Sequence, residues 1–400
     1  MMEFNFATFK AQFPALKSDN TYLDSASTSL KPKPMIDATS NYYTNSTATI
    51  LRSKHSQSIA LTEQFEQART LTRQLINAKD SHEIIWTKGA TESINLVAQS
   101  YAKALLKAED EIIVSELEHH SNLIPWLQVS KQIGAKVIKW PIEADGQLSV
   151  DRLSSLITDK TRLITVTQMS NVTGQQPDIA AISKLAHLNN AIIVVDGAQG
   201  IAHHRLDVQK LDIDFYAFST HKLYGPTGLG ILYGKSNLLT KMDCWQGGGK
   251  MLQTTSFNDF KAAPLPYKFE AGTANIAAVI GFYATLTWLS SFDWVSAEIY
   301  TCNLVDYAKS KLNSLPEITI HSVENSSLLT FSSDTIYHDD LAILLAEQNI
   351  AIRSGELCAK PLIQALNCKG VLRASFMPYN SHDDADRLVN ALHAAVQILK

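Results

Sequence analysis

The chain is poor in cysteine. Four cysteines occur in 400 residues, at positions 244, 302, 358 and 368, and none of them shows the paired Cys-x-x-Cys spacing. This pattern argues against a disulfide framework and against a zinc ribbon. We therefore expect free thiols in a reducing compartment.

The chain also lacks a large excess of charge of either sign, and it lacks long apolar runs. Charged residues make up 18% of it, both signs are interspersed, and the formal net charge is −4. This gives no electrostatic footprint for nucleic acid or an anionic membrane. No eighteen apolar residues follow one another, and residues 1–6 do not read as a signal peptide. The expected location is cytoplasmic, with neither nucleic acid nor membrane as a partner.

What the sequence does contain is an alternation of apolar strands and amphipathic helices. The length and the hydrophobic content of 45% suit a globular enzyme of two domains. Expected strands lie at 83–87, 111–115, 135–140 and 162–168, with helices at 122–133 and 150–157. This alternation predicts an α/β fold with a mostly parallel sheet and helices on both faces.

A Pro-Leu-Pro stretch at 264–266 marks the expected domain boundary. We predict a large domain over 15–265 and a small α+β domain. The small domain comprises residues 266–400 together with the N-terminal residues 1–14. Expected elements of the small domain are helices at 276–289, at 295–312 and from 382 onward, and strands near 318 and 328. The turn-rich segment 22–28 shows no catalytic pattern.

Lys222 lies just past a predicted buried strand, 215–218, in a turn that is rich in glycine. A lysine that is partly desolvated in such a place has a lowered pKa and supplies a free amine that attacks carbonyl groups. On these residues alone, a surface lysine before a hairpin is the favoured explanation.

A second apolar strand, 191–195, ends in Asp196. Open α/β sheets bind ligands at the carboxyl ends of their strands. A lysine and a carboxylate at neighbouring strand ends are what pyridoxal phosphate requires, because the lysine bonds its aldehyde carbon and the carboxylate keeps its ring nitrogen protonated. A structural Asp–Lys ion pair is the alternative.

Five motifs together resemble the cysteine desulfurases of the class V aminotransferase family, and the resemblance covers nearly the whole chain in order. The motifs are Glu118–Asn122, Val195–Gln199, Phe218–Gly228, Phe269–Thr273 and Arg353–Cys358. The resemblance is greatest to the second-group branch, which includes cysteine sulfinate desulfinases, sulfur-assembly desulfurases and selenocysteine lyases. It implies the fold type I of pyridoxal phosphate enzymes.

The resemblance implies a set of cofactor residues. His119 stacks on the pyridine ring, and Asn171 and Gln199 lie near the phenolic oxygen. The residues expected at the phosphate are Ala90, Thr91, Ser219, His221 and, from the partner subunit of a homodimer, Thr273. The metal interpretation of the adjacent histidines 119 and 120 is disfavoured, because their spacing is not that of a metal site. The segment 247–250 lacks the spacing of a nucleotide phosphate loop and is interpreted as a flexible loop.

The resemblance also implies the reaction. Arg373 binds the substrate carboxylate, since a guanidinium grips a carboxylate with two hydrogen bonds, and Arg353 flanks the same segment. Lys222 removes the Cα proton of L-cysteine, and Cys358 takes the sulfur as a persulfide, leaving L-alanine. The sulfur then passes to an acceptor protein, as in iron–sulfur cluster assembly.

The chain departs from the family pattern at four positions, which are Leu51 in the motif ending at Arg52, Ala90, Thr220 and Leu357. Other hypotheses stay open, and the last of those that follow is motivated by Leu51, Ala90 and Leu357. Selenocysteine or cysteine sulfinate could be the substrate, with the same cofactor residues. An aminotransferase or epimerase would make no use of Cys358. A sulfur-scaffold protein would keep the fold and have lost turnover.

Overall fold

The computed structural model describes residues 4–17, 19–46, 48–51 and 53–400, so Arg52 lies outside the described residues. The chain forms two compact units. The large unit comprises residues 34–168 and 177–287, and the small unit comprises the described residues of 1–33, 169–176 and 288–400. The predicted domain boundary at 265 and 266 stays a prediction.

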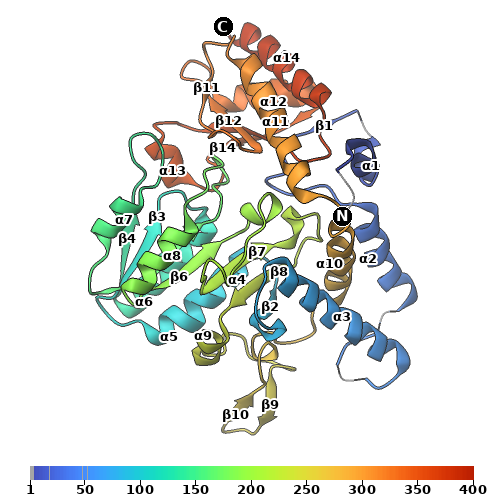
Figure 1. The fold of residues 1–400 in the computed structure, drawn as a ribbon, viewed down its shortest axis with the longest axis vertical. Helices are drawn as coiled ribbons and strands as arrows, with labels where there is room; N and C mark the ends of the chain where they lie inside the picture. Colours follow the sequence, from blue (N-terminus) through green and yellow to red (C-terminus); the bar gives the residue numbers. More distant parts are fainter. Residues whose placement is uncertain (1–3, 18, 47, 52) are drawn as a thin grey trace. The chain divides into compact units, whose positions relative to one another are not determined.

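The large unit is built on a seven-stranded sheet (Figure 1). In spatial order its strands are β2 (Ile84–Thr87), β8 (Gly230–Gly234), β7 (Phe215–Ser219), β6 (Ile192–Asp196), β5 (Thr161–Thr167), β3 (Glu111–Ser115) and β4 (Lys136–Trp140). Strand β8 is antiparallel to both of its neighbours, and all other pairs are parallel. The predicted mostly parallel sheet is confirmed. Because β8 runs against β2 and β7, the latter two end at the same edge as β3, β5 and β6.

The central strands are continuous apolar runs because both faces of the sheet are covered. Every residue of β7 is buried, including the large side chains of Phe215, Tyr216 and Phe218. Helix α4 (Ala90–Val97) packs on β7 and β8, and α8 (Ile179–Leu188) packs on β6. The packed helices therefore hold the ends of β6 and β7 in place.

The large unit contains further helices, including three that were predicted from the sequence. They are α2 (Lys33–Asn45), α3 (Ser56–Leu75), α5 (Lys103–Leu105), α6 (Ile124–Ile133), α7 (Val150–Leu156), α9 (Ser236–Lys241) and α10 (Ile276–Leu289). Helices α6, α7 and α10 confirm the predictions at 122–133, 150–157 and 276–289. A two-stranded hairpin, β9 (Leu252–Thr255) and β10 (Phe260–Ala262), extends from the large unit away from its main sheet (Figure 1).

The small unit contains a four-stranded antiparallel sheet with helices packed against it. Its strands are, in spatial order, β11 (Thr319–Ile320), β12 (Leu328–Ser332), β15 (Val371–Ser375) and β14 (Arg353–Gly355). Its helices are α1 (Phe6–Lys10), α11 (Trp294–Leu312), α12 (His338–Glu347), α13 (Lys360–Ala365) and α14 (His382–Leu399). Leu304, Leu341, Leu372 and Leu392 belong to one buried core. Two short strands, β1 (Thr21–Tyr22) and β13 (Ile350–Ala351), pair in parallel.

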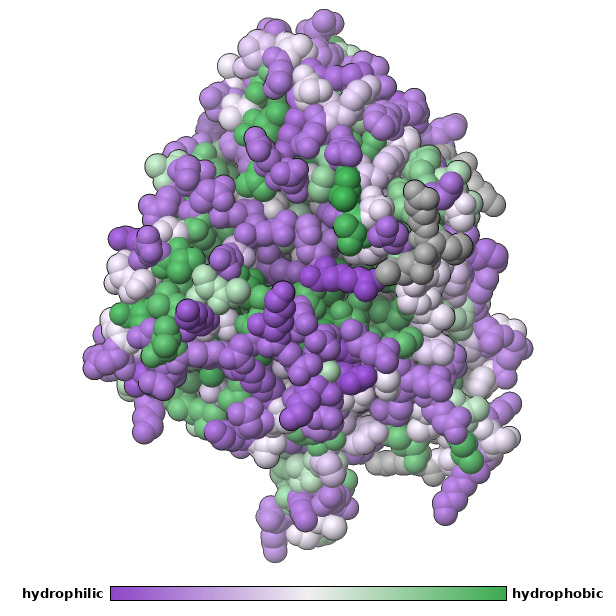
Figure 2. All heavy atoms as spheres, in the orientation of Figure 1, coloured by the Kyte–Doolittle hydropathy of each residue, from purple (hydrophilic) through white to green (hydrophobic). Residues whose placement is uncertain are grey.

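Hydrophilic side chains cover most of the visible surface, with apolar side chains scattered between them (Figure 2). Among the described residues, none of the helices combines the length and the apolar character that crossing a membrane requires.

Candidate active site

Asp196 and Lys222 follow two strands that are neighbours in the large unit. Asp196 ends β6 and pairs with Ala217 of β7, and Lys222 lies in the turn directly after β7. The Asp196 carboxyl is buried and accepts a hydrogen bond from the Ala198 N–H at 2.9 Å. Burial raises the pKa of Asp196, and the Ala198 hydrogen bond and the charge of Lys222 act in the opposite direction. A cationic partner therefore stabilises this carboxylate.

The turn that carries Lys222 is closed by Thr220, one of the departures from the family pattern. The Thr220 hydroxyl donates to the Pro226 carbonyl at 2.6 Å and lies 3.1 Å from the Leu229 carbonyl. The Thr220 N–H also donates to Leu229, at 3.1 Å. The extra side chain thus closes the turn by hydrogen bonding.

The start of α4 meets the end of β7 through Ser219 and Ala90. The Ser219 hydroxyl oxygen accepts a hydrogen bond from the Ala90 N–H at 2.8 Å. The neighbouring strand β8 must carry glycine at 230 here, because a Cβ at Gly230 would lie 2.3 Å from the Cα of Gly89. Backbone N–H groups at a helix start and a serine hydroxyl are suited to hold a phosphate.

A chain of hydrogen bonds joins α4 to the segment after β3. The hydroxyls of Thr91 and Ser121 lie 2.7 Å apart, and the Ser121 N–H donates to Nδ1 of His119 at 3.0 Å. The structure therefore connects His119 with the Thr91 and Ala90 end of α4.

Glu118 is a residue whose role the sequence analysis missed. Its buried carboxylate accepts hydrogen bonds from the Asn122 side chain at 2.6 Å and the Thr167 N–H at 2.8 Å, and it contacts the Ser115 hydroxyl. Burial raises the pKa of Glu118 to about 8, against the effect of these hydrogen bonds. The contacts fix the segment that carries His119 to the end of β5. Hydrophobic periodicity does not reveal a buried carboxylate of this kind, although Glu118 is the first residue of the motif Glu118–Asn122.

Gln199 carries a buried polar atom that suits a bound ligand. Its side-chain nitrogen lies 3.2 Å from Nε2 of His203, and its oxygen is buried without a hydrogen bond among the described residues. An unsatisfied buried polar group costs about 1–3 kcal/mol. Together with the carboxylate of Asp196 and the amine of Lys222, this residue fits the polar groups of pyridoxal phosphate.

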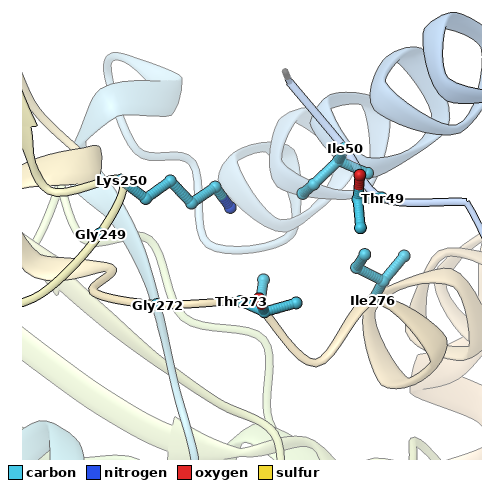
Figure 3. Close-up of a pocket in the computed structure, with 8 residues that line it drawn as sticks. Thr49, Ile50, Gly249, Lys250, Gly272, Thr273 and Ile276 are labelled. Atoms are coloured by element: carbon cyan, nitrogen blue, oxygen red, sulfur yellow. The ribbon is translucent and has the colours of Figure 1, made fainter. Parts of the chain in front are cut away.

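Thr273 lies in the loop before α10, where it contributes to a cavity with Lys250, Thr49 and Ile276 (Figure 3). Within the described chain no hydrogen bond joins it to Ser219 or Ala90. A buried ion pair anchors this loop: Glu270 accepts from Arg69 Nη1 at 2.6 Å and from Nη2 at 3.1 Å.

In the small unit, Arg373 is buried on β15 and held on three sides. Its Nη1 donates to the Asn171 carbonyl at 2.8 Å, and its Nη2 lies 3.2 Å from the Ser27 hydroxyl and 3.5 Å from the Asp24 carboxylate. Its Nε is buried and has no hydrogen-bond partner in the described part of the chain. Burial lowers the pKa of Arg373 to about 10, so the guanidinium stays charged at neutral pH. Sequence analysis missed Asp24 and Ser27, which come from the segment that showed no catalytic pattern.

Cys358 is exposed and stands on a tight turn beside this arginine. Leu357 and Cys358 both adopt left-handed backbone conformations, with φ of 50° and 55°. The Asn171 side chain donates to the Leu357 carbonyl at 2.9 Å, and Cys358 interacts electrostatically with Arg373. Two consecutive left-handed residues are uncommon outside functional sites. Leu357, one of the departures from the family pattern, is itself buried.

Arg353 lies on β14 directly opposite Arg373 in the antiparallel ladder, and its side chain is exposed. The predicted site residues therefore form two sets. The small unit holds Asn171, Arg353, Cys358 and Arg373. The large unit holds Ala90, Thr91, His119, Asp196, Gln199, Ser219, His221, Lys222 and Thr273.

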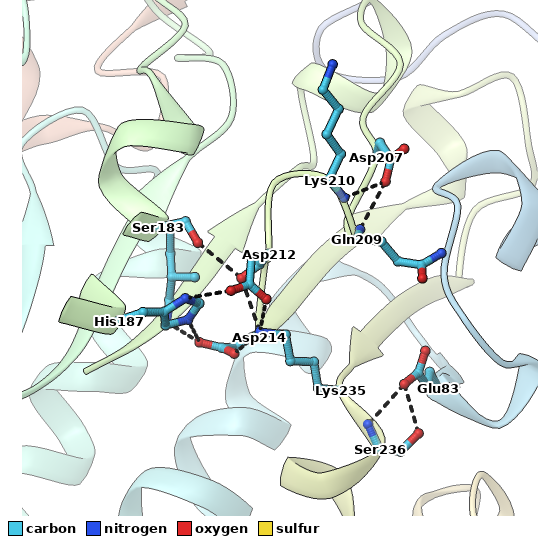
Figure 4. A network of polar contacts seen from close by, with 11 residues as sticks. Glu83, Ser183, His187, Asp207, Gln209, Lys210, Asp212, Asp214, Lys235 and Ser236 are labelled. Atoms are coloured by element: carbon cyan, nitrogen blue, oxygen red, sulfur yellow. Dashed lines mark hydrogen bonds and ion pairs between the residues drawn. The ribbon is translucent and has the colours of Figure 1, made fainter. Parts of the chain in front are cut away.

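A separate polar cluster lies at the opposite edge of the large sheet, where β7 begins and β8 ends (Figure 4). His187 and Lys235 each contact both Asp212 and Asp214, at 2.6 to 2.9 Å. The Lys235 ammonium is a counter-charge for both carboxylates, and no group of three or more metal-ligating side chains suited to an ion occurs among the described residues. We interpret this cluster as structural.

The family model described as Aminotransferase class-V matches residues 21–388, so the chain belongs to the class V aminotransferase family. Over 399 residues and the full length of both chains, it is 49% identical to the cysteine desulfurase CsdA of Escherichia coli. It is 44% identical, again over both full lengths, to a probable cysteine desulfurase of Vibrio cholerae. The crystal structure of CsdA with an S-sulfonic acid superimposes with a TM-score of 0.95, covering 99% of this chain and 100% of that one.

These similarities confirm four predictions: the family, the fold, an enzyme as the class of protein, and pyridoxal phosphate as the cofactor. The roles of individual site residues stay predictions.

Proposed function

We propose that this protein is a cysteine desulfurase that converts L-cysteine to L-alanine and forms a persulfide on Cys358. The observation that carries the proposal is the exposed Cys358 on a turn fixed by Asn171, beside the buried guanidinium of Arg373. The similarity to two proteins named as cysteine desulfurases supports it.

The large unit prepares the substrate for sulfur removal. Bound pyridoxal phosphate withdraws electron density from the bonds to the substrate Cα. Lys222 takes the proton from Cα, and Asp196 offers its buried carboxylate to the pyridine nitrogen. Other residues of this unit hold the cofactor: His119 against the ring, Gln199 at the phenolic oxygen, and Ala90, Thr91, Ser219 and His221 at the phosphate.

The small unit supplies the substrate carboxylate site and the nucleophile. Arg373 binds the carboxylate of L-cysteine, with its open Nε as one donor, and Asn171 positions the turn of Cys358. The Cys358 thiolate attacks the substrate sulfur. A sulfur–sulfur bond forms while the Cβ–sulfur bond breaks, and the electron pair left on carbon takes up a proton to give alanine.

The test compares Cys358→Ala with the matched variant Cys368→Ala in the holoprotein. Cys358→Ala should release less than about 1% of the alanine that the wild type releases from L-cysteine, since losing a catalytic nucleophile lowers kcat by far more than about 10²-fold. Cys368→Ala should keep full activity. Mass spectrometry without reductant should find the added sulfur on the Cys358 peptide. Persulfide on another cysteine, or unchanged turnover in Cys358→Ala, would contradict the proposal.

We also propose a homodimer and a sulfur-acceptor protein. In the dimer Thr273 reaches the cofactor phosphate of the partner subunit, so Thr273→Ala should weaken cofactor retention. Light scattering that shows an active monomer would contradict the dimer. Turnover on L-cysteine should be slow alone and rise when a thiol acceptor removes the persulfide.

Cysteine sulfinate is a second candidate substrate, because Arg353 places a second cation opposite Arg373. A second anionic group on the substrate would be attracted to it. Arg353→Gln should then raise the KM for cysteine sulfinate more than the KM for L-cysteine. Equal changes for the two substrates would exclude this role. Selenocysteine would be tested in the same alanine assay.

A further inference from the structure

Glu118 joins two segments of the large unit that each carry a predicted cofactor residue. On one side, it directly precedes His119 in the chain. On the other side, its Oε1 accepts a hydrogen bond from the Thr167 N–H at 2.8 Å, and Thr167 is the residue of β5 that pairs with Asp196 of β6. One buried side chain therefore ties the backbone that carries His119 to the strand end that carries Asp196.

The second oxygen of Glu118 is held by an amide whose orientation is set. Oε2 accepts from the side-chain nitrogen of Asn122 at 2.6 Å. The oxygen of the same amide accepts from the Trp126 indole N–H at 3.0 Å and from the Thr165 hydroxyl at 2.7 Å. Because an indole N–H can only donate, Asn122 must present its NH₂ group to Glu118.

Only a carboxyl group at position 118 matches these donors. The Thr167 N–H donates to one oxygen and the Asn122 NH₂ group to the other, and neither acts as an acceptor in this arrangement. A glutamine would have to direct its own NH₂ group at one of the two. A buried donor would then lack an acceptor, which costs about 1–3 kcal/mol, and the segment 118–122 would have to move.

Glu118 also lies within range of the charge of Asp196. Burial raises the pKa of Glu118 to about 8, and the charge of Asp196 acts in the same direction. The carboxyl group is therefore mostly uncharged at pH 7, and the Ser115 hydroxyl, which contacts Oε1, can rotate to accept its proton. Replacement by glutamine thus changes the hydrogen bonding of this group and leaves the charge beside Asp196 nearly the same.

We propose that Glu118 is a positioning residue of the active site, which fixes the ring contact of His119 relative to the carboxylate of Asp196. It acts through the backbone of its own segment and of β5 rather than through contact with the substrate. The inference rests on the proposed function, because that function assigns His119 to the pyridine ring and Asp196 to the ring nitrogen.

The test compares Glu118→Gln with Glu116→Gln in the holoprotein. Glu116 is the matched control, because it is a buried carboxyl group two residues away that contacts Lys139 at 2.6 Å and the Ile142 N–H at 3.1 Å instead. Glu118→Gln should weaken cofactor binding at least about tenfold, as loss of a hydrogen bond that orients a ligand residue does at metal sites. Glu116→Gln should weaken it less than about twofold.

Two further readouts separate positioning from a general loss of stability. The visible circular dichroism of the bound cofactor, which reports how its ring is held, should change in Glu118→Gln and not in Glu116→Gln. When Glu118→Gln is added to His119→Ala, it should weaken cofactor binding by less than about threefold, because the contact that it positions is already lost.

Equal effects of the two glutamine variants on the spectrum and on cofactor binding would overturn the proposal, as would a full tenfold effect on top of His119→Ala. If Glu118→Gln does not fold, the milder Ser115→Ala decides: a change in the same spectrum supports the proposal, and no change overturns it. The proposed function fails separately, when wild-type holoprotein releases no alanine from L-cysteine.

Discussion

The buried pair of Arg69 and Glu270 supports a double-mutant test of how the Thr273 loop is held. Their side chains are 1% and 4% exposed, and the Trp86 N–H also donates to Glu270 at 2.9 Å. Burial lowers the pKa of Arg69, but the charges and hydrogen bonds of Glu270 and Glu66 raise it by more. The pKa of Arg69 therefore lies above its ordinary value. The pair connects α3, β2 and the loop before Thr273.

Glu270→Gln leaves a buried guanidinium with only Glu66 as its counter-charge, through a contact of 2.9 Å to Nε. Breaking a buried pair in this way costs about 3–5 kcal/mol. Arg69→Met leaves a buried carboxylate and should cost a similar amount. The double variant removes both charges, so it should lose about 2–3 kcal/mol less than the sum of the single changes.

The assay is urea unfolding of the holoprotein, followed by fluorescence and by far-ultraviolet circular dichroism to check that the transitions coincide. Cofactor retention should fall in both single variants and recover in part in the double variant. Additive losses, with a coupling energy near zero, would refute the inference that the two charges stabilise one another.

Three further predictions concern single sites. Iodoacetamide should modify exposed Cys358 at least about tenfold faster than Cys302, as measured by mass spectrometry. The reason is that the thiolate is the reactive form, and burial raises the pKa of the Cys302 thiol to about 12. Gly230→Ala should destabilise the protein by about 1–3 kcal/mol in urea unfolding, because its methyl group would collide with Gly89. Burial lowers the pKa of His321 below 6.5, so the unfolded chain takes up a proton first and stability should fall as the pH drops below 6.5. His321→Gln should flatten this slope, measured by unfolding at several pH values.

Gly248→Ala is the control for Gly230→Ala. Gly248→Ala should change stability by less than about 0.5 kcal/mol, since the nearest atom to the added methyl would be 3.8 Å away. Equal labelling of Cys358 and Cys302, or an unchanged slope in His321→Gln, would show that burial does not govern these groups.

The sequence predicted the parts of the site that follow from local pattern. Buried strands are apolar runs, so the ends at Asp196 and Lys222 were visible, and helix α10 was predicted with the bounds that it has. Contacts between distant segments leave no such pattern. Glu270 stands 201 residues from Arg69, and Asp24 stands 349 residues from Arg373. The placement of Lys250 beside Phe65 is of the same kind, because only the folded chain brings the two together.

The antiparallel course of β8 has a consequence for motion. The segment between β7 and β8 is bounded at both ends by ladder hydrogen bonds, and Thr220 bonds across it to Pro226 and Leu229. Opening of its backbone would break the hydrogen bonds of Thr220. The travel of the Lys222 amine that the proposed mechanism requires is therefore a matter of rotations within its four-carbon side chain, which are far faster than loop opening.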